Sequence, residues 1–223
     1  MKNSFKSNDK FNDLLYKQRH ECRAKRQKLR TYGMKELYQE LCEEYKLFKD
    51  YLPKDLHRVL DIGCGLGYID VVISDHNPDL SFYMFDAASS GDGKVYLFYN
   101  NLELTREFLT LNDIPNERIT LIDATSTGIE QAKNQNPDVL KGLPPIDLVV
   151  STYAWGWHSR IPKFIAEVSE VLRPGGRVII EVKGDVGENH HQDNLETIKA
   201  HGFTHLDSIQ VMKGKHLFII EKI

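Results

Sequence analysis

The chain has 223 residues, 41% of them hydrophobic and 27% charged, which is enough for one ordinary globular core. Its net charge of −3 excludes an overall attraction to nucleic acid or to an anionic membrane, although charge can still be local. No apolar run reaches the length of a membrane span, and the N-terminus lacks the apolar segment of a secretion signal. The three cysteines, Cys22, Cys42 and Cys64, have no zinc-ligand spacing, and their odd number argues against a disulfide framework. We expect a soluble, cytoplasmic protein without a metal site.

Residues 1–52 are predicted to be helical. Apolar residues recur at helical spacing over 34–48 and form an amphipathic stripe that ends before Pro53. Between 16 and 30 the chain holds seven Lys and Arg against one Glu. This basic segment is either a solvated helix face or an arm that contacts phosphate or caps a substrate. The stripe packs either on the chain's own core or on a second subunit.

From residue 56 the pattern changes to short apolar runs that alternate with helical segments. This alternation predicts right-handed βαβ units on a parallel sheet. The stretch 202–223 reads instead as two strands joined by a turn at Gly214, and such a hairpin makes the last strand antiparallel. We expect a helical extension at 1–52 and one α/β domain at 53–223. The earlier strands are HRVLDIG, LSFYMFD, RITLID, IDLVVST and RVIIEVK.

The strongest motif is VLDIGCGLGYID, in which the first strand turns into a helix that begins near Tyr68. Glycine suits such a turn because the backbone bends sharply and a ligand can approach it without hindrance from a Cβ atom. The spacing is GxGxG after an acid, whereas the dinucleotide motif is GxGxxG. A carboxylate beside the loop repels phosphate but suits a cationic or hydroxyl-bearing ligand. The motif residues are Asp61, Gly63, Gly65 and Gly67.

Two further carboxylates end predicted strands. Asp86 follows the second strand, where an acid in nucleotide-binding α/β folds accepts hydrogen bonds from ribose hydroxyls, and Asp123 ends the third. Either one alone could merely cap the next helix. Ligands of open α/β sheets bind at the carboxyl ends of the strands, so three acids on that rim, counting Asp61, predict a binding site there.

With these motifs the chain resembles the class I S-adenosylmethionine-dependent methyltransferases, over roughly 53–223. VLDIGCGLG, FYMFDAAS, ITLIDAT, IDLVVST and VLRPGGRVIIEV are similar to five of the family's motifs, in the family's order. The resemblance implies a Rossmann-like, doubly wound α/β fold with a seven-stranded sheet and an antiparallel last strand. It also implies S-adenosyl-L-methionine as cofactor.

The same resemblance implies roles for individual residues. The glycine loop and Asp61 would hold the methionine part of the cofactor, and Asp86 the ribose hydroxyls. Asp123 and the backbone of Ala124 would hold the adenine. The stretches GLGYID, YNNLELTREFL and STYAWGWH further resemble bacterial and phage-type enzymes described as sugar or small-molecule O-methylases.

The segment STYAWGWHSR follows the fourth strand and holds both tryptophans. We predict that Tyr153, Trp155 and Trp157 contact the substrate, because aromatic rings stack on flat groups and attract a sulfonium. Alternation along an extended segment would put both indoles on one side; the alternative is that one or both anchor the next helix to the core. His158 is the candidate base, since a hydroxyl nucleophile must lose a proton, although it could simply hydrogen-bond the loop.

The loop KGDVGENHH supplies competing groups on the same rim, and we place His190 in the substrate site. The other candidate bases there are Lys183, Asp185, Glu188 and His191. The two adjacent histidines lack the spacing that a metal site needs.

We therefore predict methyl transfer to a small hydroxylated molecule such as a sugar or sugar nucleotide. The fourth strand does not end in the Asn/Asp-Pro-Pro-aromatic signature of enzymes that methylate nucleobase amines. Two alternatives remain: an RNA-modifying enzyme that uses the basic arm, and a non-catalytic module that binds the cofactor. A nicotinamide dehydrogenase is a more distant reading.

Overall fold

A computed structural model describes residues 5–13, 34–86, 102–124, 137–152, 154–156, 160–184 and 189–223. These residues form one seven-stranded sheet in the order β3-β2-β1-β4-β5-β7-β6. The parallel strands are β1 (Arg58–Ile62), β2 (Ser81–Asp86), β3 (Ile119–Asp123), β4 (Ile146–Ser151) and β5 (Leu172–Lys183). A hairpin of β6 (Phe203–Met212) and β7 (Lys215–Lys222) completes the sheet, with β7 antiparallel to both of its neighbours. The predicted sheet and its antiparallel last strand are confirmed.

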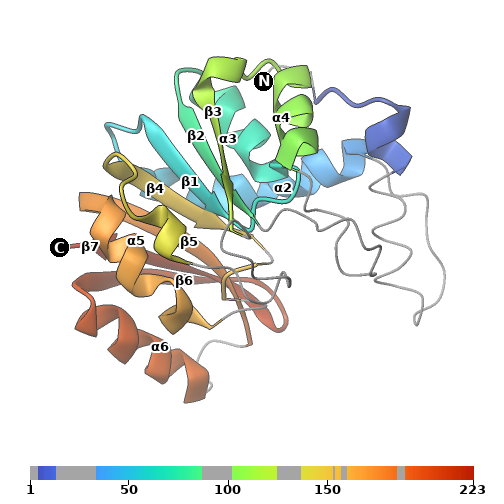
Figure 1. Ribbon diagram of the computed structural model, residues 1–223. Coiled ribbons are helices and arrows are strands. Elements are labelled where there is room, and N and C mark those ends of the chain that lie inside the picture. The colour runs from blue at the N-terminus through green and yellow to red at the C-terminus, as the bar shows by residue number, and fades with distance from the viewer. Residues whose placement is uncertain are drawn as a thin grey trace, which may run out of the picture.

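Two layers of helices cover the sheet (Figure 1). One face carries α2 (Met34–Phe48), α3 (Tyr68–His76) and α4 (Leu102–Leu111), and the other carries α5 (Ile165–Val171) and α6 (Asn189–Ala200). The described residues also form four 3-10 turns: η1 (Lys49–Tyr51), η2 (Asn116–Arg118), η4 (Pro137–Leu140) and η5 (Ile161–Lys163). No helix of the described ranges is long and apolar enough to cross a membrane.

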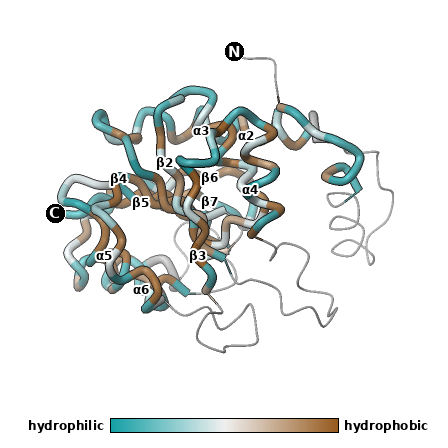
Figure 2. Tube along the Cα trace, turned by 45° about the horizontal axis from the view of Figure 1, so that its top comes forward, coloured by the Kyte–Doolittle hydropathy of each residue, from teal (hydrophilic) through white to brown (hydrophobic). Residues whose placement is uncertain are grey.

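The core lies on both faces because side chains alternate along each strand. Val59 packs with α3 and α4, whereas Leu60, the next residue, packs with α5. The central strands are mainly hydrophobic in Figure 2, as expected for strands that are buried on both faces. β4 shows this fully, since all six of its residues are buried.

The amphipathic stripe of α2 packs on the chain's own sheet. Leu41, Tyr45 and Phe48 are buried in the same core as β1 and α3. Phe11, in the short helical stretch 9–13, also reaches this core and packs edge-on against Phe108 with ring centroids 5.1 Å apart. The whole basic segment, 16–30, lies outside the described residues.

Candidate functional site

The glycine loop joins β1 to α3 at the carboxyl edge of the sheet. The N–H groups of Gly63 and Cys64 both donate to the carbonyl of Phe85 in β2, at 2.8 and 3.2 Å. Gly63, Gly65 and Gly67 all have positive φ, between 53° and 77°, which favours glycine. A Cβ atom on Gly63 would lie 2.1 Å from the Cβ of Ala154, and one on Gly67 would lie 2.8 Å from Leu109 Cδ2. Packing therefore leaves no room for a Cβ atom at Gly63, and at Gly67 the φ of +77° favours glycine.

Asp86 supports the loop from β2. Its carboxylate accepts a hydrogen bond from the N–H of Gly65 at 2.9 Å, and its carbonyl accepts one from the N–H of Ala124 at 2.9 Å. Asp86 also pairs in register with Asp123 on β3. The structure thus brings together the predicted residues of the first three strand ends. Asp86 is 6% exposed, so most of its carboxylate surface faces the protein.

Asp61 and Asp70 form a pair of buried carboxyl groups next to the loop. They come from β1 and the first turn of α3 and are 1% and 0% exposed. Burial, and then the charge of Asp70, raises the pKa of Asp61 well above its usual range, and burial raises the pKa of Asp70 to about 6. Sequence reasoning missed Asp70. The available signal was a single acid within the apolar run Ile69–Ile73, whose residues are all buried.

The segment after β4 is held against the glycine loop. The Ser151 hydroxyl donates to the carbonyl of Ile62 at 2.6 Å and accepts from the N–H of Trp155 at 2.9 Å. Two residues of this segment touch neighbouring elements closely: Ala154 contacts Gly63, and Gly156 lies against the carbonyl of Glu181. The first residues of STYAWGWHSR therefore line the carboxyl edge beside the loop, as predicted.

Trp155 takes the anchoring role that the sequence left open as an alternative. The indole is 1% exposed, packs edge-on against Phe164 at 5.8 Å and donates from Nε1 to the carbonyl of Ile161 at 3.1 Å. The Trp155 side chain is part of the hydrophobic core and anchors the start of the next helical segment to it. The indole of Trp155 is therefore unavailable for contact with a substrate, contrary to the prediction.

Other predicted site residues fall outside the described residues. These are Tyr153, Trp157 and His158, and the side chain of His190, whose backbone belongs to α6. Their predicted roles stay predictions.

A buried charged cluster, also missed from the sequence, joins α2 to the sheet near the same edge. The Lys215 ammonium lies 3.3 Å from a carboxylate oxygen of Glu44 and forms an ion pair with Glu181. All three side chains are buried. Burial, followed by the neighbouring Glu44 carboxyl, raises the pKa of Glu181 to about 9. No pattern in the sequence joins residues so far apart.

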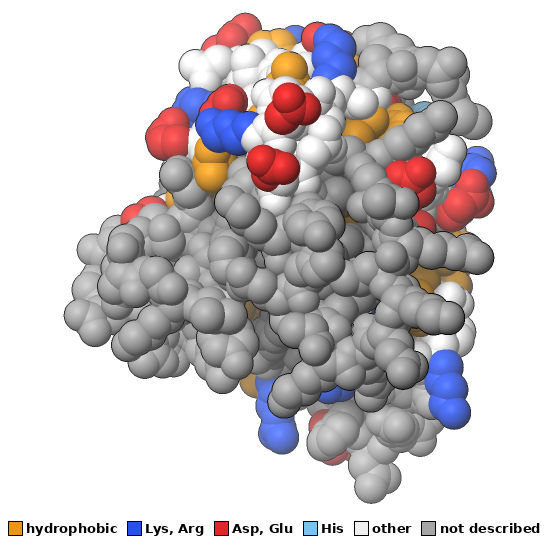
Figure 3. All heavy atoms as spheres, turned by 90° about the vertical axis from the view of Figure 1, so that its right-hand side faces the viewer, with side chains coloured by type: hydrophobic (Ala, Val, Ile, Leu, Met, Phe, Trp, Pro, Cys, Tyr) orange, Lys and Arg blue, Asp and Glu red, His pale blue; other side chains and the backbone are white. Residues whose placement is uncertain are grey.

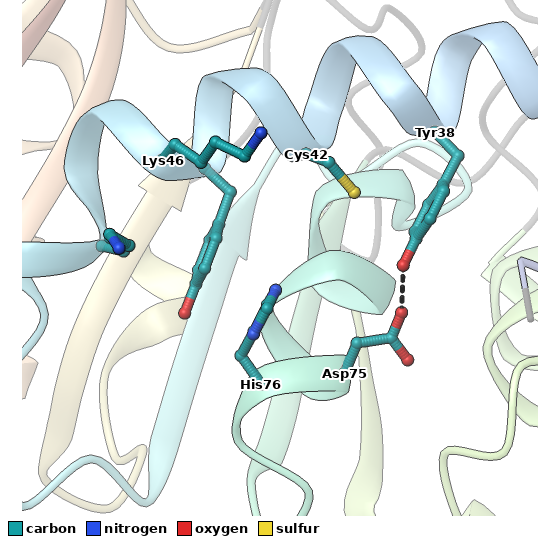
Figure 4. A pocket seen from close by; sticks show the side chains of 7 residues that line it. Tyr38, Cys42, Lys46, Asp75 and His76 are labelled. Carbon is teal, nitrogen blue, oxygen red and sulfur yellow. Dashed lines mark hydrogen bonds between the residues drawn. The ribbon is translucent and has the colours of Figure 1, made fainter. Parts of the chain in front are cut away.

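A cavity of about 490 Å³ lies between α2 and α3, at the opposite end of α3 from the glycine loop (Figure 4). The Tyr38 hydroxyl donates to Asp75, and the Tyr45 ring stacks on His76 with centroids 4.6 Å apart. Burial, and then the hydrogen bond to Asp75, raises the pKa of Tyr38. These contacts attach α2 to α3, so the cavity belongs to a helix–helix contact and is separate from the rim of strand ends.

Comparison with known proteins places this geometry in a family. A family model described as "Methyltransferase domain" matches residues 23–217. No curated protein matches the chain. Eight solved structures that share the fold are 11% to 16% identical to the chain.

Three of these structures illustrate the similarity. A candidate O-methyltransferase from Nostoc punctiforme is 14% identical with a TM-score of 0.58, over 83% of this chain and 56% of that one. An O-methyltransferase family 2 protein from Planctomyces limnophilus, in complex with apigenin, is 14% identical with a TM-score of 0.54, over 86% and 62%. The S-adenosylmethionine-dependent methyltransferase SibL is 16% identical with a TM-score of 0.52, over 94% and 68%. The chain thus spans less than two thirds of the first two proteins.

The residues present fit this cofactor class. The glycine loop leaves no room for a Cβ atom at Gly63, and Asp61 Oδ1 is buried with no hydrogen-bond donor among the described residues, which suits a cationic group. The chain belongs to the methyltransferase-domain family.

Proposed function

We propose that the chain transfers the methyl group of S-adenosylmethionine to a hydroxyl oxygen of a small molecule such as a sugar or sugar nucleotide. The observation that carries this proposal is the contact between Gly63 and Ala154. It puts the segment after β4 directly beside the glycine loop. The residues that follow include Trp157 and His158, which offer a stacking surface and a proton acceptor.

The cofactor residues follow the strand ends. We propose that Asp61 and the loop residues Gly63, Gly65 and Gly67 hold the methionine part. Asp86 would hold the ribose, with its rim position and its hydrogen bond to Gly65 in support. Asp123 and Ala124 would hold the adenine, since Ala124 is fixed by its hydrogen bond to Asp86.

The reaction requires two things of the protein: alignment of the acceptor and removal of its proton. The cofactor supplies an electrophilic methyl group on a sulfonium. The chain must align the acceptor, an effect worth about 7 to 11 kcal/mol when the geometry is right. It must also accept the hydroxyl proton, for which we propose His158, at a gain of about 10² to 10⁴ in rate. Tyr153, Trp157 and His190 are the proposed substrate contacts.

Two further observations support an oxygen acceptor. β4 runs into Ser151-Thr152-Tyr153 and not into Asn/Asp-Pro-Pro-aromatic. Two of the three structures described above carry O-methyltransferase names. Against an RNA substrate, the described Lys and Arg side chains on the face in Figure 3 are mixed with Asp and Glu.

The test is methyl transfer from labelled S-adenosylmethionine to a panel of sugars, sugar nucleotides and phenols, with total RNA as a separate arm. His158→Ala should keep cofactor affinity and lose about 10² or more in turnover on a hydroxyl acceptor. His57→Ala is the matched control, because His57 is exposed beside the opposite end of β1.

The results separate the alternatives. Normal turnover in His158→Ala would contradict its role as base. Labelling of RNA alone would replace the small-molecule proposal. Tight cofactor binding with no labelled product from any acceptor would favour the non-catalytic reading.

A further inference from the structure

Asp61 and Asp70 lack donors that two ionised carboxylates would need. Asp61 Oδ1 and both carboxyl oxygens of Asp70 are buried without a hydrogen-bond donor among the described residues. The two carboxyl groups are also neighbours, since the charge of Asp70 acts on Asp61. Ionised carboxylates only accept hydrogen bonds, so two neighbouring ones without donors repel each other, and a proton on one of them removes that repulsion. Burying a carboxylate oxygen without a donor costs free energy, so burial favours the form of the pair that keeps one proton.

The side chains around Asp61 and Asp70 are either acidic or uncharged. Asp86 faces it from β2, and Cys64 lies in the loop. The strand neighbours of Asp61 are Met84 and Val150, which are apolar. Among the described residues, no Lys, Arg or His forms an ion pair with Asp61 or Asp70. The raised pKa values of both groups agree with this arrangement.

We propose that Asp61 and Asp70 share a proton in the cofactor-free protein, and that binding of the ammonium group of the cofactor's methionine part releases this proton to solvent. Before binding, the pair carries one proton and one negative charge. After binding, the ammonium stands in for the proton: the O–H bond of the carboxyl group breaks, the proton passes to water, and two carboxylates face one cation. Asp70 is then a positioning residue, which acts on the cofactor through Asp61.

This inference rests on the proposed cofactor role of Asp61 and makes cofactor affinity depend on pH. A ligand that displaces one proton binds more tightly as pH rises, by up to about tenfold for each pH unit while the pair still holds its proton. The acceptor substrate plays no part, so the effect can be measured by binding alone.

The experiment is calorimetry with S-adenosylhomocysteine between pH 5.5 and 7.5, in two buffers that differ in ionisation enthalpy. We expect proton release, seen as a heat that depends on the buffer, and an affinity that rises with pH. 5′-Methylthioadenosine carries the same nucleoside without the ammonium group. Its binding should show neither effect.

Asp70→Asn keeps the size of the side chain and gives Asp61 an amide donor in place of a shared proton. It should still bind S-adenosylhomocysteine, with release reduced severalfold and a flat pH profile. Asp75→Asn, on the same helix, is the matched control and should behave as wild type. If Asp70→Asn fails to fold, the comparison of the two ligands on the wild-type protein still decides.

Equal buffer dependence for the two ligands, or undiminished release in Asp70→Asn, would overturn the proposal. Absence of binding heat for both ligands, with intact protein, would instead contradict the cofactor assignment itself. The two failures are therefore distinguishable.

Discussion

The Lys215 ammonium lies 3.3 Å from the carboxylate of Glu44, although the two residues are 171 positions apart. Through Lys215 and its second partner, Glu181, helix α2 is joined to β5 and β7 inside the core. Breaking a buried ion pair from one side leaves an uncompensated charge, which costs more than the pair contributes. The N-terminal helix is thus held to the sheet by charge as well as by its apolar stripe.

Lys215→Met should lower the free energy of unfolding by about 3 to 5 kcal/mol, because two buried carboxyl groups lose their cation. Urea unfolding measures this. Lys213→Met is the matched control, since Lys213 is exposed in the turn two residues earlier. Equal stability of the two variants would show that the buried cluster contributes nothing.

Gly63→Ala tests the tight packing of the glycine loop. The substitution adds a Cβ atom 2.1 Å from that of Ala154 at a φ of +76°, so the loop or the segment after β4 must move. We expect cofactor affinity to fall by about tenfold or more, which corresponds to about 1.4 kcal/mol. Calorimetry with S-adenosylhomocysteine measures the loss.

Gly142→Ala is the control for backbone strain alone. Its φ is +88°, yet an added Cβ would meet nothing within 4 Å. It should cost about 1 to 2 kcal/mol of stability and leave cofactor affinity unchanged. If Gly63→Ala bound the cofactor as tightly as Gly142→Ala, the close approach of Ala154 would have no effect on cofactor affinity.

The sequence predicts the sheet and its rim well, for a local reason. Each strand, its terminal acid and the glycine turn lie within one short stretch, and the parallel topology then brings Asp61, Asp86 and Asp123 to one edge. Asp70 and Lys215 could not be found in this way. Their roles depend on burial and on partners from other elements, which no local pattern records.

The misplaced Trp155 has a different cause. The prediction assumed an extended segment after the fourth strand, along which both indoles would share a side. The strand ends at Ser151, and Gly156 has a φ of +87°, which is not an extended conformation, so the assumption of an extended segment fails within the described residues.

Trp155→Ala should therefore act on stability. Removal of a fully buried indole costs about 3 to 5 kcal/mol. Trp155→Phe keeps a ring against Phe164 and loses the hydrogen bond to Ile161, so we expect a smaller loss of about 1 to 2 kcal/mol. Thermal or urea unfolding measures both.

Trp157→Ala, compared with Trp155→Ala, tests whether the two tryptophans have different roles. As a proposed substrate contact, Trp157 should affect KM or turnover more than unfolding. A larger effect of Trp157→Ala than of Trp155→Ala on stability, with unchanged kinetics, would reverse the two assignments.

Asp147 should make the fold sensitive to acid. Its carboxylate accepts hydrogen bonds from the N–H groups of His57 and Arg58, at 2.9 and 2.7 Å, and pairs with Arg173. Burial opposes ionisation, but the Arg173 hydrogen bond and the backbone donors outweigh it and hold the pKa of Asp147 below its usual value of 3.8. These contacts join the start of β1 to β4 and β5.

The lowered pKa of Asp147 determines how the stability of the fold changes with pH. A carboxyl group with a lowered pKa in the folded state stabilises the fold fully above its unfolded pKa, and the contribution disappears as pH falls through the folded value. Asp147→Asn should thus cost about 2 kcal/mol near neutral pH. The gap between wild type and variant should narrow below about pH 4, where the unfolded carboxyl gains its proton. Urea unfolding across this range measures it.

Asp79→Asn is the control, because Asp79 pairs with Arg118 while its side chain is 87% exposed. Exposed pairs of this kind contribute between about 0 and 1 kcal/mol, so its stability should follow wild type at every pH. A gap for Asp147→Asn that stayed constant down to about pH 3 would mean that the loss comes from packing or from neutral hydrogen bonds and not from ionisation of the carboxyl group.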